Sequence, residues 1–141
     1  MSLRRAQGLI AGIFLAGLLC NCVAVLLTYA RGSIFADDLR AMLQLLLAEY
    51  SAPLAIVIAG IFGQAPAEKR RLAGTFWFAI AVSIVWNLFL LWGASALLIS
   101  SLGSEAKEGA VDDFSSYVRT ISSSATFLVS GALTYFFVKR A

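Results

Sequence analysis

The sequence predicts an all-α integral membrane protein, with four transmembrane helices in an up-down bundle. Of its 141 residues, 60% are hydrophobic and only 13% are charged. Soluble domains are about 45–50% apolar and about 25% charged, and a soluble chain this short could not bury so much apolar surface. Four long apolar segments, at about 8–29, 41–63, 72–100 and 120–138, each supply the roughly 20 residues that a spanning helix needs.

These four segments are predicted to be helices because none alternates apolar and polar residues as the strands of membrane barrels do. Only helices and closed barrels satisfy their backbone in lipid. The whole chain, 1–141, is then one transmembrane domain. Acidic pairs precede the second and fourth segments, at 37–38 and 112–113, where the helix dipole favours them. A helix over 112–138 would be about 40 Å long at 1.5 Å per residue, which exceeds the roughly 30 Å core of a bilayer. The second and third helices are similarly overlong, so we expect the second, third and fourth helices to extend beyond the bilayer on the outer face.

Basic residues predict the orientation, because cytoplasmic loops are enriched in lysine and arginine. Seven basic residues lie at the two chain ends and between the second and third segments: Arg4, Arg5, Lys69, Arg70, Arg71, Lys139 and Arg140. The opposite side has four basic residues and six acidic ones. Both termini are thus predicted to be cytoplasmic, in a bacterial inner membrane. The seven residues form a basic cytoplasmic face suited to anionic lipid, or to an acidic soluble protein partner.

Small residues recur every four positions along two of the predicted helices. They are Gly8, Gly12, Ala16, Cys20 and Ala24 in the first, and Ser51, Ala55, Ala59 and Gly63 in the second. Small side chains let helix backbones approach closely in a membrane. The two stripes could pack within one chain or hold copies together. Four short helices have too few inward faces to bury both stripes, so we expect a homo-oligomer, symmetric around the membrane normal.

Glu49 is the only acidic residue inside a predicted span. A charge there costs about 2.5–3.5 kcal/mol on insertion scales, so an intramembrane acid is a functional candidate. Pro53, four residues later, has no N–H for the Glu49 carbonyl, which predicts a kink. Counting depth along each helix predicts a polar intramembrane cluster of Asn21, Glu49, Asn87, Thr126 and Ser130. Glu49 could be a neutral packing residue, a proton- or ion-responsive group, or a carboxyl that binds lipid or substrate.

The residues do not predict an enzyme. The sequence has no histidine, no glycine-rich phosphate loop and no pair of acids in one span. Its two cysteines, Cys20 and Cys22, point to nearly opposite faces of a helix and cannot clamp one metal ion. We therefore expect no catalytic residue, no metal, no cofactor and no nucleic-acid partner.

The leading functional hypothesis is a non-catalytic oligomeric membrane subunit in contact with the lipid bilayer. It would form a pore, or would anchor and signal to a soluble partner through its basic cytoplasmic face. Such a role would suit a bacterial stress or defence system. The alternative is a proton-coupled small-molecule transporter that uses Glu49.

Overall fold

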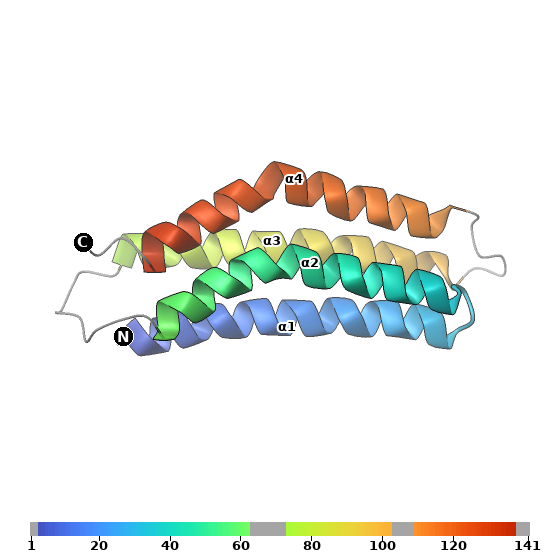
Figure 1. The fold of residues 1–141 in the computed structure, drawn as a ribbon, viewed down its shortest axis with the longest axis horizontal. Helices are drawn as coiled ribbons and strands as arrows, with labels where there is room; N and C mark the ends of the chain where they lie inside the picture. Colours follow the sequence, from blue (N-terminus) through green and yellow to red (C-terminus); the bar gives the residue numbers. More distant parts are fainter. Residues whose placement is uncertain (1–2, 63–72, 103–108, 138–141) are drawn as a thin grey trace.

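The protein is a bundle of four long helices. The computed structural model describes residues 3–62, 73–102 and 109–137. The helices are α1 (Leu3–Ala30), α2 (Ala36–Phe62), α3 (Ala73–Ser100) and α4 (Ala110–Phe137). Successive helices run in opposite directions, so the start of α1 and the end of α4 lie at the same end of the bundle (Figure 1). The predicted all-helical, up-down architecture is therefore confirmed for the described residues.

Three of the four helices have the length and apolar character needed to cross a membrane. They are α1, α2 and α3, over Arg5–Ala30, Ala36–Phe62 and Phe76–Ser100. α4 has 28 residues, as many as α1 and α3, but it is less apolar. At 1.5 Å per residue each helix is about 40 Å long, which exceeds the roughly 30 Å hydrocarbon core of a bilayer. The predicted fourth span, 120–138, is thus part of a longer helix that begins at Ala110.

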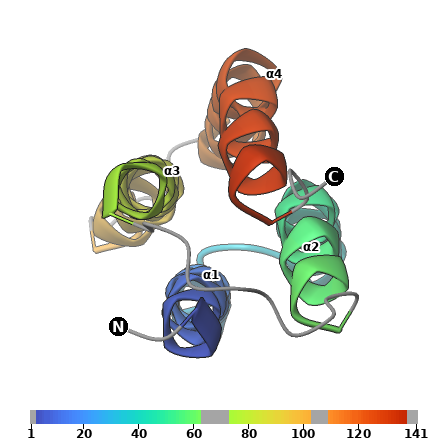
Figure 2. The same ribbon diagram turned by 90° about the vertical axis from the view of Figure 1, so that its left-hand side faces the viewer.

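The helices form a square in which neighbours along the chain are not always neighbours in space. α1 and α4 each pack against both α2 and α3, whereas α2 and α3 occupy opposite corners (Figure 2). The parallel pairs α1/α3 and α2/α4 therefore lie side by side. This arrangement brings side chains of α1, α2 and α3 together in the middle of the bundle.

Local sequence explains the tight connection between α1 and α2. Gly32 adopts a left-handed conformation with φ of 74° just past the end of α1, and its N–H donates to the carbonyl of Tyr29 at 2.8 Å. Glycine is favoured at this position because it has no Cβ to clash. At the start of α2, the carboxylate of Asp38 accepts from the N–H of Phe35 at 3.2 Å, which caps the helix. Asp37 and Asp38 thus occupy the first turn of α2, as predicted.

The outer surface of the bundle is apolar as well as its core. Trp86, Tyr50 and Phe14 are among the largest fully buried side chains. On the surface, Trp77 and Trp92 of α3 are 65% and 71% exposed. Monomeric soluble proteins rarely carry such continuous apolar patches, whereas a bilayer accepts them. α2 is also bowed along its length (Figure 1), and the buried Pro53 lies within it.

Candidate functional site

A chain of hydrogen bonds crosses the middle of the bundle. The Tyr50 hydroxyl of α2 donates to Asn87 Oδ1 of α3 at 2.7 Å and accepts from Asn21 Nδ2 of α1 at 3.2 Å. All three side chains are buried. In an apolar interior an unpaired amide or hydroxyl is costly, so these bonds hold the three helices in one register. We call Asn21, Tyr50 and Asn87 the polar triad.

The polar triad depends on a close approach between α1 and α3. A Cβ built on Gly17 would overlap Asn87 Oδ1 and Cγ, and would lie 3.1 Å from Asn87 Cβ. The Gly17 carbonyl also accepts from Asn21 Nδ2 at 2.9 Å. Asn87 Nδ2 is held by the Ser83 carbonyl at 2.8 Å, which leaves the asparagine little freedom to turn away. Gly17 is therefore the contact point that lets the triad form.

α4 reaches the same layer of the bundle. Two contacts align it with α3: the Tyr117 hydroxyl donates to the Phe89 carbonyl at 3.0 Å, and the rings of Phe76 and Phe136 lie 6.1 Å apart. Because the two helices are antiparallel (Figure 1), residues 86 and 87 of α3 fall between these contacts, opposite the stretch of α4 at about 119–126. This layer contains the buried polar atoms without a partner in the described structure, which are Asn21 Oδ1, Trp86 Nε1, Ser122 Oγ and Thr126 Oγ1.

The structure brings together some of the predicted cluster and adds a residue that sequence reasoning missed. Asn21 and Asn87 meet through Tyr50, not through Glu49. Glu49 is half-buried one position earlier on α2, and no hydrogen bond or ion pair reaches it within the described ranges. Ser130 is also half-buried. The sequence could have indicated Tyr50, because it lies at the same depth as the two asparagines and a tyrosine hydroxyl can bridge two amides.

The two small-residue stripes lie mainly on the outside of the bundle. Gly8, Gly12, Ala16 and Cys20 of α1, and Ser51, Ala55 and Ala59 of α2, are exposed, whereas Ala24 is buried and Gly63 lies outside the described residues. A Cβ added to Gly8 or Gly12 would meet nothing within 4 Å. The close approaches inside the chain occur instead at Gly17 and at Gly93, where a Cβ would lie 2.6 Å from the Tyr117 ring. The stripes are therefore free to contact another molecule.

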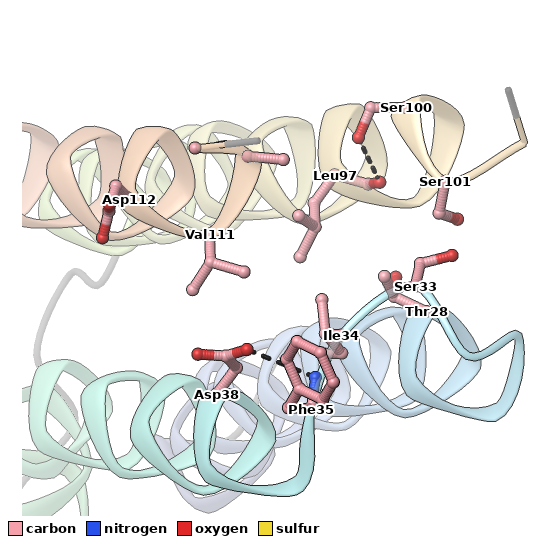
Figure 3. A pocket seen from close by; sticks show the side chains of 12 residues that line it. Thr28, Ser33, Ile34, Phe35, Asp38, Leu97, Ser100, Ser101, Val111 and Asp112 are labelled. Atoms are coloured by element: carbon pink, nitrogen blue, oxygen red, sulfur yellow. Dashed lines mark hydrogen bonds between the residues drawn. The ribbon is translucent and has the colours of Figure 1, made fainter. Parts of the chain in front are cut away.

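A cleft opens at the end of the bundle where α2 and α4 begin. Its volume is about 520 Å³. Figure 3 shows Asp38 on one wall and Asp112 on the other, with the Ser100 and Ser101 hydroxyls above the α1–α2 connection. Among the described residues that line it, Asp38 and Asp112 carry the charge. The acidic pairs at the starts of α2 and α4 are visible in the sequence. The sequence does not show that these two helix ends lie together, and only the fold reveals this.

The basic face that the sequence predicts to be cytoplasmic is only partly described. Arg5 of α1 is exposed, and Arg4 belongs to α1 without a described side chain. Lys69, Arg70, Arg71, Lys139 and Arg140 fall outside the described residues. Within the described ranges no group of three or more His, Cys, Asp or Glu side chains could hold a metal ion. Cys20 and Cys22 are free thiols.

Comparison with protein families, with curated proteins and with solved structures found no match to this chain. The fold and the composition therefore define its class without help from relatives. It is a four-helix bundle in which three helices are long and apolar enough to cross a membrane. Such a chain has the character of an integral membrane protein.

Proposed function

We propose that this chain is a non-catalytic membrane subunit that assembles with copies of itself into a pore lined by α4. The observation that carries the proposal is the outward face of α4, which is rich in hydroxyl groups. Its exposed residues include the hydroxyl-bearing Ser116, Thr120, Ser123, Ser124 and Thr134, together with the apolar or aromatic Phe127, Leu128 and Tyr135. The outward face of α3 is apolar by contrast, with exposed Trp77, Phe78, Val85, Leu88, Phe89 and Trp92.

The contrast between these two faces suggests different surroundings. Apolar side chains on α3 suit acyl chains, whereas hydroxyl groups suit water or another helix. The Thr120 and Ser123 hydroxyls bond to carbonyls of their own helix at 2.8 and 3.0 Å. Such bonds make the face tolerable in a membrane but do not explain why it carries so many hydroxyls. A helix that lines a water-filled lumen would be less apolar than its neighbours, as α4 is.

The exposed small residues supply a means of assembly. α2 lies next to α4 in the bundle, and its outward stripe of Ser51, Ala55 and Ala59 is open to a second copy. Close packing through this stripe, or through Gly8 and Gly12 of α1, would bring several α4 helices around one axis.

Thiol labelling in liposomes tests which face meets the lumen. After Cys20 and Cys22 are replaced by serine, Ser124→Cys is compared with Val85→Cys, which lies on the outer face of α3 at nearly the same level. A charged, water-soluble thiol reagent is expected to block the conductance of Ser124→Cys by at least about half and to leave Val85→Cys unchanged. Equal effects on both, or no conductance from the folded parent protein, would argue against a pore lined by α4.

Assembly is tested separately by native mass measurement in mild detergent. Ala55→Leu and Gly12→Leu are each expected to reduce the fraction of oligomer, because a bulky side chain separates the two backbones. Ala81→Leu, on the exposed face of α3, is the matched control and should leave the oligomer intact. A parent protein that is monomeric at every concentration would contradict the proposal.

Proton-coupled transport by Glu49 is the second candidate. The observation that favours it is a half-buried carboxyl without a partner in the described structure, one residue from the polar triad. If Glu49 moves protons, Glu49→Gln should abolish substrate-dependent proton flux in liposomes and leave the oligomer intact, because glutamine keeps the shape but cannot ionise. If Glu49 only packs, Glu49→Gln should change neither flux nor stability, while Glu49→Leu should lower stability.

A further inference from the structure

The polar layer in the middle of the bundle contains hydrogen-bonding groups that the protein does not pair. Asn21, Trp86 and Ser122 are 0%, 1% and 4% exposed, and each has a polar atom without a partner in the described structure. The fourth unpaired atom is Oγ1 of Thr126, which is half-buried on α4. These atoms come from α1, α3 and α4, and the alignment of α3 with α4 puts Trp86 beside the segment that holds Ser122 and Thr126.

The four groups differ in whether they can find another hydrogen-bond partner within their own helix. A serine or threonine hydroxyl in a helix can turn to bond the carbonyl four residues back, as Thr28 and Ser83 do at 2.9 and 2.7 Å. Ser122 and Thr126 could therefore satisfy themselves. The indole N–H of Trp86 cannot reach its own backbone in this way, and it can only donate. Asn21 uses Nδ2 for both of its described bonds, so Oδ1 remains as an acceptor.

We propose that buried water occupies this layer, accepting a hydrogen bond from Trp86 Nε1 and donating one to Asn21 Oδ1. Water is the ligand class that fits, because the site offers one obligate donor, one obligate acceptor and two hydroxyls that can do either. Buried water in proteins makes about three such bonds to otherwise unpaired groups. The water adds a second link between α1 and α3 beside the polar triad, next to the Ser122 and Thr126 hydroxyls of α4. This inference concerns the interior of one chain and does not depend on the pore.

Nuclear magnetic resonance of the full chain in phospholipid nanodiscs, with ¹⁵N-labelled tryptophan, tests the inference. Trp77→Phe and Trp92→Phe, which change exposed residues, assign the three indole signals. The Trp86 Nε1 proton is expected to show cross-relaxation with the water resonance, of the sign that marks a long-lived bound water. Labelling asparagine instead reads the Asn21 side-chain amide, which should show the same signal in Tyr50→Phe, where the hydroxyl 3.2 Å from Asn21 Nδ2 is absent.

A hydroxyl proton that exchanges with solvent could imitate bound water, so the control removes the nearby hydroxyls. In the Ser122→Ala, Thr126→Val double variant the Trp86 signal is expected to persist at half its strength or more. Its loss in that variant would mean that the indole bonds a protein hydroxyl directly, which overturns the inference. Absence of the water signal from Trp86 in the parent protein overturns it as well.

Discussion

Gly17→Leu is expected to prevent the bundle from folding. A Cβ at this position already overlaps the Asn87 side chain, and the rest of a leucine would have to enter the same space. Asn87 cannot yield cheaply, because it bonds Tyr50 Oη and the Ser83 carbonyl. Overpacking costs about 1–3 kcal/mol, and a buried polar group that loses its partner costs about 1–3 kcal/mol more. The measurement is the yield of monodisperse protein in detergent, followed by unfolding in sodium dodecyl sulfate.

Gly12→Leu is the matched control for this result. Gly12 lies in the same helix, but a Cβ there meets nothing within 4 Å. The Gly12→Leu chain is therefore expected to fold with parental stability, even where its assembly is weakened. If both variants unfold, glycine is needed along all of α1, for instance to insert into the membrane, and the contact between α1 and α3 is not the reason. If both variants fold, the inference that α1 and α3 approach closely at Gly17 is wrong.

The comparison of Gly12 with Gly17 shows what the sequence could and could not predict. Four-residue spacing identified one face of α1, and that face proved to be exposed from Gly8 to Cys20 but buried at Ala24. The pattern indicates that a small surface exists but not which neighbour it meets. Gly17 lies off the stripe, and its role follows from the position of Asn87 on α3, which is 70 residues away in sequence. Periodicity along one helix cannot supply a contact of that kind.

The sequence could predict how deep the polar residues lie in the bundle, but not which of them bond to one another. Counting residues from the ends of each segment put Asn21 and Asn87 at one level, and in the structure both side chains bond the Tyr50 hydroxyl. The choice between Glu49 and its neighbour Tyr50 depends on the rotation of α2 about its own axis. Adjacent residues differ by about 100° in a helix of 3.6 residues per turn. That rotation is set by the square arrangement, in which α2 packs against α1 and α4.

Tyr50 is expected to contribute more to stability than any other single polar side chain of the triad, because it alone contacts both of the others. Its side chain is fully buried, and its ring packs edge-on against Phe14, with centroids 6.4 Å apart. Tyr50→Ala removes both the ring and the hydroxyl, and should cost about 3–5 kcal/mol, as truncating a large buried aromatic does. Tyr50→Phe keeps the ring and removes only the hydroxyl, so it measures the contribution of the hydroxyl to stability. It should cost about 1–3 kcal/mol, because Asn87 Oδ1 loses its donor in an apolar surrounding.

A double-mutant cycle of Tyr50→Phe with Asn87→Ala separates the hydrogen bond from the effects of each residue alone. Because the Tyr50 hydroxyl and Asn87 Oδ1 lie 2.7 Å apart, the two changes should be less than additive, by about 1 kcal/mol in the free energy of unfolding. Tyr29→Phe, an exposed tyrosine on α1, should change stability by less than about 0.5 kcal/mol. Additive effects of Tyr50→Phe and Asn87→Ala would show that this bond contributes nothing, and that the register of α2 and α3 depends on their packing against α1 and α4.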